Sequence, residues 1–204
     1  MNDFDSLYKE LVEHIVQLEN KFIKQYIPAD PALLPSVYDL DVRAYCILSH
    51  AAFEQFFEQV ALKVMIQSID NWMEPERKIN GSLLALAAFS DKRLKYDETT
   101  SDIPFDNLKN TFEAAKKSLS QLIIKKNHGI SADDLATILL PVGLHIHTDI
   151  NLRNSLNQLV RQRGEYAHNG TLNSVLAPED AQKYVSDCLL LCNDIVKKAN
   201  DKFE

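Results

Sequence analysis

The fold is decided by residues 42–65, VRAYCILSHAAFEQFFEQVALKVM. Apolar residues surround nearly the whole circumference of this segment when it is wound as a helix, and such a helix is usually the buried centre of a bundle. We therefore expect a central helix over about residues 39–72. Arg43, His50 and Glu54 interrupt it at spacings of seven and four, which puts them on one face. Packing alone does not explain a polar stripe there.

The rest of the chain has the same helical periodicity. Further helices are expected around residues 7–22, 81–94, 105–126, 131–140, 150–168 and 178–202. Ser131, with Asp134 three residues on, and Asp149 are the expected side-chain caps of two of these helices. Proline-containing segments at 28–35 and 97–104 are expected to be loops. Five glycines are too few for the tight turns of an all-β protein or for the phosphate loop of a Rossmann sheet. The predicted fold class is all-α, an antiparallel helical bundle with additional helices, formed by a single domain over residues 1–204.

The composition is that of a globular protein, with 46% apolar and 25% charged residues. The net charge of −7 argues against non-specific coating of nucleic acid, because binding along the phosphate backbone needs positive charge. A small basic cleft remains compatible with it. The first residues, MNDFD, lack the basic region of a signal peptide, and the longest apolar run, 83–89, is too short to span a membrane. We expect a cytoplasmic protein without a membrane partner.

Metal and cofactor sites are not predicted. Cys46, Cys188 and Cys192 lack the number and spacing of a disulfide framework or a structural zinc site. His145 and His147 could suggest metal ligands, but a His-x-His pair at a metal site commonly lies on a strand, where alternate residues share a face. Since no sheet is expected, a surface or interhelix role is the preferred interpretation of these histidines.

The helix over residues 150–168 carries a cation in register with its buried face. Its leucine and valine stripe continues, at the same spacing of three and four, into Arg163. Burying an unpaired charge is costly, and arginine does not lose its proton in proteins. Arg163 is therefore expected to need a carboxylate, a subunit interface or an anionic ligand. We predict that Glu54 is the carboxylate that pairs with it.

Residues 159–170, LVRQRGEYAHNG, resemble the signature of the HEPN superfamily (higher eukaryotes and prokaryotes nucleotide-binding domains). In that signature an arginine, four to six residues and a histidine close a bundle helix, and Arg163 and His168 are the matching residues. Residues 42–54 are similar to the second helix of the subgroup named for association with endoribonuclease L-PSP. The chain departs from the pattern at Gly164, where the family has a polar residue, and at Asn169, which separates His168 from a glycine. It also lacks the tyrosine, two residues after the histidine, of a branch in which that tyrosine is modified.

The resemblance implies a metal-independent endoribonuclease. Such an enzyme cleaves RNA through the 2′-hydroxyl and leaves a 2′,3′-cyclic phosphate and a 5′-hydroxyl. Histidine transfers protons near neutral pH, and a planar guanidinium suits the charge that grows on the phosphoryl oxygens. Arg163 and His168 are the implied catalytic pair, and Arg43, His50 and Glu54 are expected to support them.

The neighbouring residues Arg161, Tyr166 and Asn169 are the expected contacts to substrate. Five residues along a helix turn by roughly 140° and rise about 7.5 Å, so Arg163 and His168 diverge on one straight helix. Either the helix unwinds over residues 167–170, or two chains bring their pairs together about a two-fold axis. HEPN nucleases are expected to do the second, as homodimers with a composite active site.

The resemblance also implies a biological setting. HEPN domains in bacteria often act as toxins or phage-defence effectors, so an antitoxin protein is an expected partner besides RNA. Two other interpretations stay open. One is a non-catalytic HEPN module that binds a partner protein or a nucleotide, with Gly164 as a sign of decay. The other is a helical interaction protein in which an Arg163–Glu54 pair sets the helix register.

Overall fold

The computed structural model describes residues 3–30, 32–90, 105–126, 129–146, 149–169 and 176–204, without the side chains of residues 126 and 166–169. All regular secondary structure in these residues is helical. The α-helices are α1 (Asp3–Phe22), α2 (Pro35–Met73), α3 (Gly81–Phe89), α4 (Phe105–Lys126), α5 (Ala132–Leu139), α6 (Ile150–Asn169) and α7 (Pro178–Asn200). The short 3-10 helices are η1 (Lys24–Tyr26) and η2 (Leu140–Val142). The predicted all-α fold class is confirmed.

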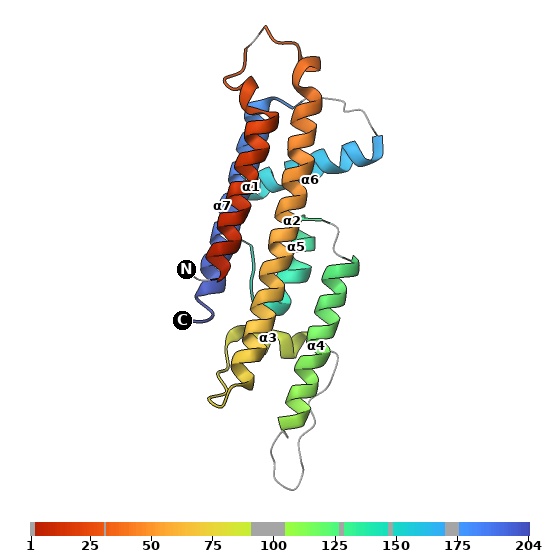
Figure 1. Ribbon diagram of the computed structural model, residues 1–204. Helices are drawn as coiled ribbons and strands as arrows, with labels where there is room; N and C mark the ends of the chain where they lie inside the picture. The colour runs from red at the N-terminus through yellow and green to blue at the C-terminus, as the bar shows by residue number, and fades with distance from the viewer. Residues whose placement is uncertain (1–2, 31, 91–104, 127–128, 147–148, 170–175) are drawn as a thin grey trace.

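The 39-residue helix α2 is the axis of the molecule (Figure 1). α1 runs antiparallel to it, α7 lies alongside, and the start of α1 lies near the end of the chain, where Phe4 stacks on Phe203. α2 contacts all the other described α-helices. Its sequence explains this position, because a helix that is apolar nearly all round loses its water contacts only when neighbours cover every side. In the part of the chain that the structure describes, none of the helices has a stretch long and apolar enough to cross a membrane.

Three helices begin or end at positions that differ by several residues from those expected. α1 begins at Asp3 rather than near residue 7. α2 begins at Pro35 rather than near residue 39, because proline suits the first turn of a helix, where an N–H has no helical partner. α3 ends at Phe89 rather than near residue 94, and Ser90 already has an extended backbone with φ −68° and ψ 133°. The loop expected over residues 97–104 lies outside the described residues.

Side-chain caps begin α5 and α6, as their sequences predicted. At α5, Asp134 N donates to Ser131 Oγ at 3.2 Å, and Ser131 N donates to Asp134 Oδ2 at 3.0 Å. This reciprocal pair is a capping box, which satisfies two backbone donors that the helix itself leaves unpaired. At α6, Asn151 N donates to Asp149 Oδ1 at 2.8 Å. Each cap thus fixes the first turn of its helix.

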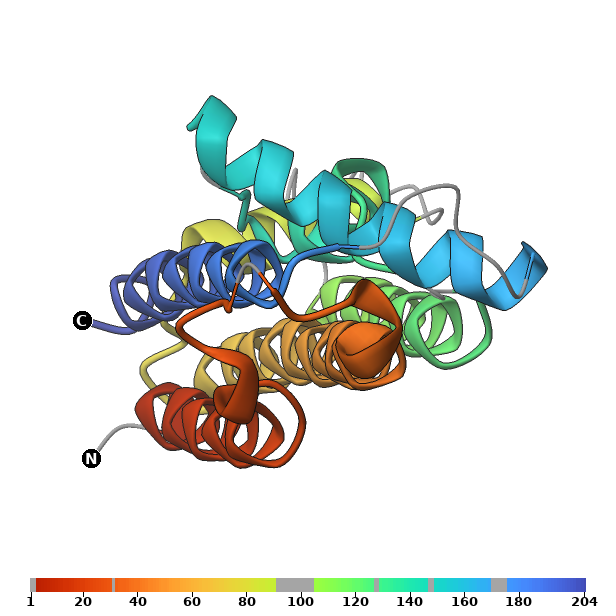
Figure 2. The ribbon, with the colours of Figure 1, turned by 90° about the horizontal axis from the view of Figure 1, so that it is seen from above.

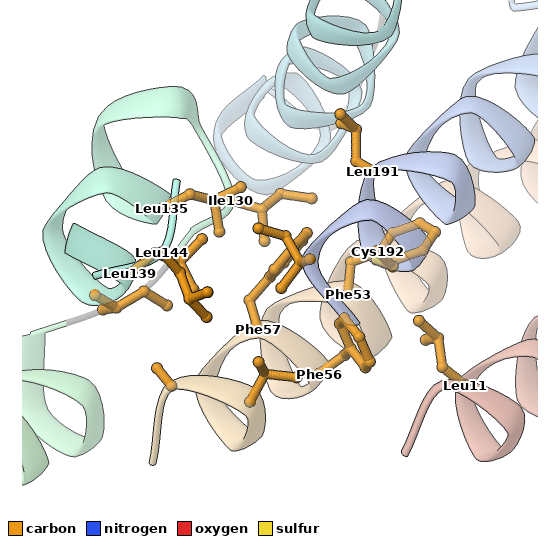
Figure 3. Close-up of a cluster of buried hydrophobic side chains, with 14 of the residues drawn as sticks. Leu11, Phe53, Phe56, Phe57, Ile130, Leu135, Leu139, Leu144, Leu191 and Cys192 are labelled. Carbon is orange, nitrogen blue, oxygen red and sulfur yellow. The ribbon is translucent and has the colours of Figure 1, made fainter. Parts of the chain in front are cut away.

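The core lies where α2 meets α1, α5 and α7 (Figure 3). Phe53 and Phe57 of α2 are fully buried and lie among aliphatic side chains of the neighbouring helices. Leu135, the residue after Asp134, is also fully buried in this cluster. Burial of these large side chains is the main stabilising contribution to the fold.

α6 crosses the other helices at a steep angle, which is clear in the view from above (Figure 2). It contacts both α2 and α7. Its C-terminal end protrudes beyond the bundle in both views. The first half of α2 is therefore covered by a helix that continues away from the core.

Candidate functional site

The polar face of α2 carries the three residues that the spacing predicted to share it. His50 is 2% exposed, and its Nδ1 lies 3.8 Å from Glu54 Oε2, one turn further along. Arg43 lies nearly two turns before His50 and binds Asp39 through two atoms, with Nε at 2.9 Å from Oδ1 and the terminal nitrogen at 2.5 Å from Oδ2. The face therefore begins with a partly exposed ion pair and continues into a buried imidazole.

Arg163 of α6 is brought to this face by the crossing of the two helices. Burial first, and then the positive charge of Arg163, lower the pKa of His50 from 6.5 to about 4, although the charge of Asp134 acts in the opposite direction. Both causes disfavour a second positive charge on the imidazole. His50 is therefore neutral at pH 7. The structure thus brings together Arg163 and His50, two of the residues singled out from the sequence.

The buried stripe of α6 ends differently from its expected register. Leu156 and Leu159 are fully buried, and Gln162 continues the stripe at 6% exposure, whereas Arg163 is half-buried beside it. Gln162 Oε1 has no hydrogen-bond partner among the described residues. Glu54 lies next to His50, with its Oε2 at 3.8 Å from the imidazole Nδ1, and the pairing of Arg163 with Glu54 stays a prediction. Arg163 is thus placed at the edge of the buried face, where a guanidinium retains contact with water.

The sequence analysis did not assign Asp134 to the site. This carboxylate belongs to the first turn of α5 and acts electrostatically on His50. The capping motif SADD, residues 131–134, was visible, but a capping role alone explains it. No local signal in the sequence shows that the first turn of α5 faces the middle of α2, because this depends on the packing of α5 against α2.

The residues expected to bind substrate lie on the last turns of α6. Arg161 is exposed, and its Nε donates to Glu165 Oε1 at 2.6 Å, one turn further on. Tyr166 and Asn169 belong to α6 by their backbone, and their side chains lie outside the described part of the chain. The same holds for His168. The predicted roles of these four residues stay predictions.

The backbone of α6 bears on one of the two geometries that the Arg-x4-His spacing allowed. α6 continues without interruption to Asn169, so unwinding within residues 167–169 is wrong. The intrahelical hydrogen bonds hold the last turn in the α conformation, although Gly170 follows in the sequence. Positions 163 and 168 therefore differ by roughly 140° around the helix axis and by about 7.5 Å along it.

The three cysteines and the histidines at positions 145 and 147 are not among the site residues expected from the sequence. Cys46, Cys188 and Cys192 are buried and free, and burial raises the pKa of each thiol. Among the described residues no group of three or more His, Cys, Asp or Glu side chains has a geometry that could hold a metal ion. His145 is exposed at the surface, and His147 lies outside the described residues.

Comparison with known proteins gives one match that covers nearly the whole chain. The family model described as RiboL-PSP-HEPN matches residues 3–201. No curated protein and no solved structure matches the chain. The matched range contains the polar face of α2, the capped start of α5 and the whole of α6. This chain belongs to the RiboL-PSP-HEPN family, as the resemblance of its residues 42–54 and 159–170 indicated.

Proposed function

We propose that this protein is a metal-independent endoribonuclease. The observation that carries the proposal is the place of Arg163, half-buried beside the polar face of α2 and five residues before His168 in a chain of the HEPN family. A half-buried guanidinium next to a neutral imidazole carries a net positive charge that can bind an anion. A phosphodiester with developing negative charge is the ligand class that suits it best.

The proposed chemistry uses the substrate's own nucleophile. The 2′-oxygen attacks the adjacent phosphorus, the bond from phosphorus to the 5′-oxygen breaks, and a 2′,3′-cyclic phosphate forms. The proton from the 2′-hydroxyl goes to a base, and an acid supplies one to the leaving 5′-oxygen. Arg163 stabilises the charge on the non-bridging oxygens, and His168 acts as the proton-transfer group. DNA has no 2′-hydroxyl and is not cleaved.

The state of His50 favours His168 for proton transfer. With a pKa of about 4, His50 is a weak base near pH 7 and has no proton to give as an imidazolium. Its side chain is only 2% exposed, so an RNA substrate has little access to it. We therefore assign His50, with Glu54, to holding the environment of Arg163.

The active site is proposed to be composite. On the continuous helix α6, positions 163 and 168 lie on different sides of the helix axis. The guanidinium and the imidazole of one chain are therefore not expected to meet at a single phosphate. The end of α6 protrudes from the bundle (Figures 1 and 2). A two-fold axis near this end would bring Arg163 of one chain near His168 of the other, and each motif would then serve twice. A homodimer is the expected oligomeric state.

The test is cleavage of end-labelled RNA by the purified chain in the presence of EDTA. Wild type is expected to cleave and to leave cyclic phosphate ends, whereas Arg163→Ala and His168→Ala are expected to lose at least about a hundredfold in rate. A mixture of the two inactive variants regains part of the activity if the site is composite, since some heterodimers then carry one intact pair. Absence of cleavage by folded wild type on diverse RNAs would contradict the proposal.

Gly164 favours a second candidate function, a HEPN module that binds RNA, a nucleotide or a partner protein without cleaving. The family usually has a polar side chain here, and a Cβ at Gly164 would meet no described atom within 4 Å. The position is therefore open space rather than a steric requirement for glycine. If wild type binds RNA without cleaving it, Gly164→Asn is expected to restore cleavage, and Gly164→Ala serves as the matched control without a polar group.

At the level of the cell we propose a toxin or phage-defence role held in check by an antitoxin protein. This role follows from the family and from the proposed nuclease activity. Expression in a bacterial host is expected to arrest growth, and His168→Ala is expected to relieve the arrest. Equal growth with the wild-type and His168→Ala chains, at equal soluble levels, would speak against the role.

A further inference from the structure

The first half of α2 has a second apolar side, which its own bundle leaves exposed. The large side chains of Val37, Leu40, Ile47 and Leu48 are 53%, 75%, 38% and 41% exposed. The opposite side of the same turns is buried in the core. Exposed apolar side chains that lie next to one another mark an interaction surface, because leaving water is favourable for all of them at once.

These side chains follow the repeat of a helix. Positions 37, 40, 44, 48 and 51 are separated by three or four residues, so they lie within roughly 80° around the helix axis. Together with position 47 they form the α2 stripe. Gln55 and Gln59 follow on the same side and are exposed, so polar residues separate the stripe from Ile66, which is 42% exposed on the same side.

The α2 stripe is symmetric about Ala44. Leu40 and Leu48 lie four positions before and after it, and Val37 and Ala51 lie seven positions before and after it. In an antiparallel pair of α2 helices with a two-fold axis at Ala44, each residue meets the one at the mirrored position of the other chain. Leu40 then packs against Leu48 twice, and the small side chain at the axis lets the two helices approach closely. A partner of another sequence requires no such symmetry.

The charges beside the stripe also suit a second copy of the chain. A two-fold axis at position 44 brings the same flank of both helices together, and the two copies of Arg43 lie within about 3 Å of each other along the helix axis. Asp39 compensates this cation within its own chain, with Arg43 Nε at 2.9 Å from Asp39 Oδ1. On the other flank, Asp41 accepts a hydrogen bond from Tyr26 OH at 2.7 Å. Its copy is displaced by about 9 Å along the axis, where salt screens the repulsion.

We infer that the α2 stripe is the surface through which two copies of this chain form a dimer, with their α2 helices antiparallel and Ala44 at the two-fold axis. Arg43, His50 and Glu54 lie beside the stripe on one flank of the helix, so the polar face of α2 borders the interface. The dimer surface stands by itself. Its importance for RNA cleavage rests on the proposed function.

The protruding end of α6 is the expected second part of the interface. A stable dimer buries roughly 800 Å² on each partner, which is more than one stripe on one helix supplies. α6 contacts α2, and its C-terminal end protrudes at the level of the first half of α2 (Figure 1). The inferred axis therefore agrees with the composite site proposed for Arg163 and His168.

The direct test is sedimentation equilibrium of the full-length chain at several concentrations. Wild type is expected to dimerise, and Leu40→Glu and Leu48→Glu are expected to raise the Kd of the dimer at least about tenfold, because each places a carboxylate in both apolar contacts of the pair. Both side chains are exposed in the single chain, so circular dichroism should show a retained fold.

Ile66→Glu is the matched control, because Ile66 has nearly the exposure of Leu48 on the same side of the same helix, outside the stripe. It is expected to keep the wild-type Kd. Equal effects of Leu48→Glu and Ile66→Glu, or a wild-type Kd in both stripe variants, would overturn the inference. A monomeric wild type would also overturn it and would leave the stripe to a different protein.

Cross-linking tests the position of the axis. Ala44→Cys places two thiols at the axis, and oxidation is expected to link two chains, since a disulfide needs Cα atoms less than about 7 Å apart. Ala51→Cys is expected to stay unlinked, because its copy lies about 21 Å away along the helix. The native cysteines are buried and free. Linkage through position 51 but not through position 44 would contradict the antiparallel arrangement.

RNA cleavage separates the surface from the proposed function. At concentrations where wild type is dimeric and Leu40→Glu is monomeric, Leu40→Glu is expected to lose cleavage, while Ile66→Glu keeps the wild-type rate. An active monomer would contradict the composite site. Absence of cleavage by wild type would contradict the proposed function, and sedimentation and cross-linking would still decide the dimer surface.

Discussion

The two halves of α2 bury different kinds of side chain. In the C-terminal half, residues 56–72, every fully buried side chain is apolar except Ser68. In the N-terminal half, residues 42–54, the adjacent Ser49 and His50 are both buried, and Glu54 lies half-buried next to them. Both halves belong to one continuous helix and are covered by neighbouring helices. The difference therefore lies in which groups the covering helices present.

The comparison separates stabilising burial from burial that has a cost. Apolar side chains in the C-terminal half gain free energy when they leave water. In the N-terminal half, a buried imidazole lies near the Arg163 cation, which makes its protonation unfavourable. Departures from an apolar core are expected at functional sites, where stability is given up for a defined electrostatic environment. Substitutions in the C-terminal half should therefore change stability through packing. Substitutions in the N-terminal half should change how stability depends on pH.

The largest expected effect is on the apolar half. Phe57→Ala is predicted to lower the free energy of unfolding by about 3–5 kcal/mol, because Phe57 is fully buried and truncation leaves a cavity. Urea unfolding at pH 7, followed by circular dichroism, measures the change. Leu84→Ala, at a leucine that is 63% exposed, is the control and is expected to change stability by less than about 0.5 kcal/mol. Equal losses of stability in the two variants would show that the C-terminal half of α2 is not tightly packed around Phe57.

The next effect concerns the pH dependence from the polar half. An unfolded imidazole binds its proton near pH 6.5, and folded His50 near pH 4, so acid favours the unfolded chain. The stability that depends on a neutral His50 is fully present above pH 6.5 and is lost progressively as the pH falls toward 4. The total loss in the free energy of unfolding is roughly 3 kcal/mol.

His50→Gln should therefore flatten the stability curve between pH 6.5 and 4. Unfolding free energies of both chains at several pH values within this window measure the effect. His14→Gln, at an exposed histidine, is expected to keep the wild-type slope. A wild-type slope in His50→Gln would mean that another group produces the acid sensitivity.

A smaller effect is expected at the cap of α5. Ser131→Ala removes the acceptor for Asp134 N and is predicted to cost about 1 kcal/mol. Thr137→Ala, in the same helix, removes a hydroxyl that donates to the carbonyl of Asp133 at the surface and should leave stability nearly unchanged. Thermal melts of the two variants make the comparison. Identical melting temperatures would show that the cap does not stabilise the helix.

The smallest effect on stability is expected on the exposed end of α6. Arg161→Ala should leave the melting temperature unchanged, because an exposed ion pair with Glu165 contributes little. Arg161→Ala should weaken the binding of single-stranded RNA. It should also lower the slope of binding affinity against salt concentration by about one phosphate contact, which titrations at several salt concentrations measure. Glu165→Gln frees the guanidinium from its partner and is expected to strengthen binding. Identical salt dependences in all three chains would remove Arg161 from the substrate contacts.

Much of the fold follows from local patterns. The helix over residues 105–126 was predicted with the bounds that α4 has, and the capping residue of α5 was recognised from its hydroxyl and the following aspartates. Such features depend on a few neighbouring residues, and the sequence shows them directly. The start of α2 was missed because Pro35 lies inside a proline-rich segment that reads as loop. Proline suits both a loop and the first turn of a helix, so the local sequence does not distinguish the two.

The candidate site could be predicted only in part. Helical spacing placed Arg43, His50 and Glu54 on one face, which the backbone of α2 makes unavoidable. The same reasoning put Arg163 fully in the buried stripe of α6, whereas Gln162 has that place in the structure. A helix that crosses its neighbours at a steep angle buries different faces along its length, and the crossing angle is not encoded in the spacing of its own apolar residues.

The amino-acid order of this protein determined which segments are helical and which residues share a face, because both follow from hydrogen bonds and spacing within a few turns. The docking of α5 and α6 against α2 decided which charges act on His50, because Asp134 and Arg163 belong to helices distant from it in the chain. The pKa of His50 is a consequence of that packing, since burial and the field of a distant guanidinium exist only in the folded chain.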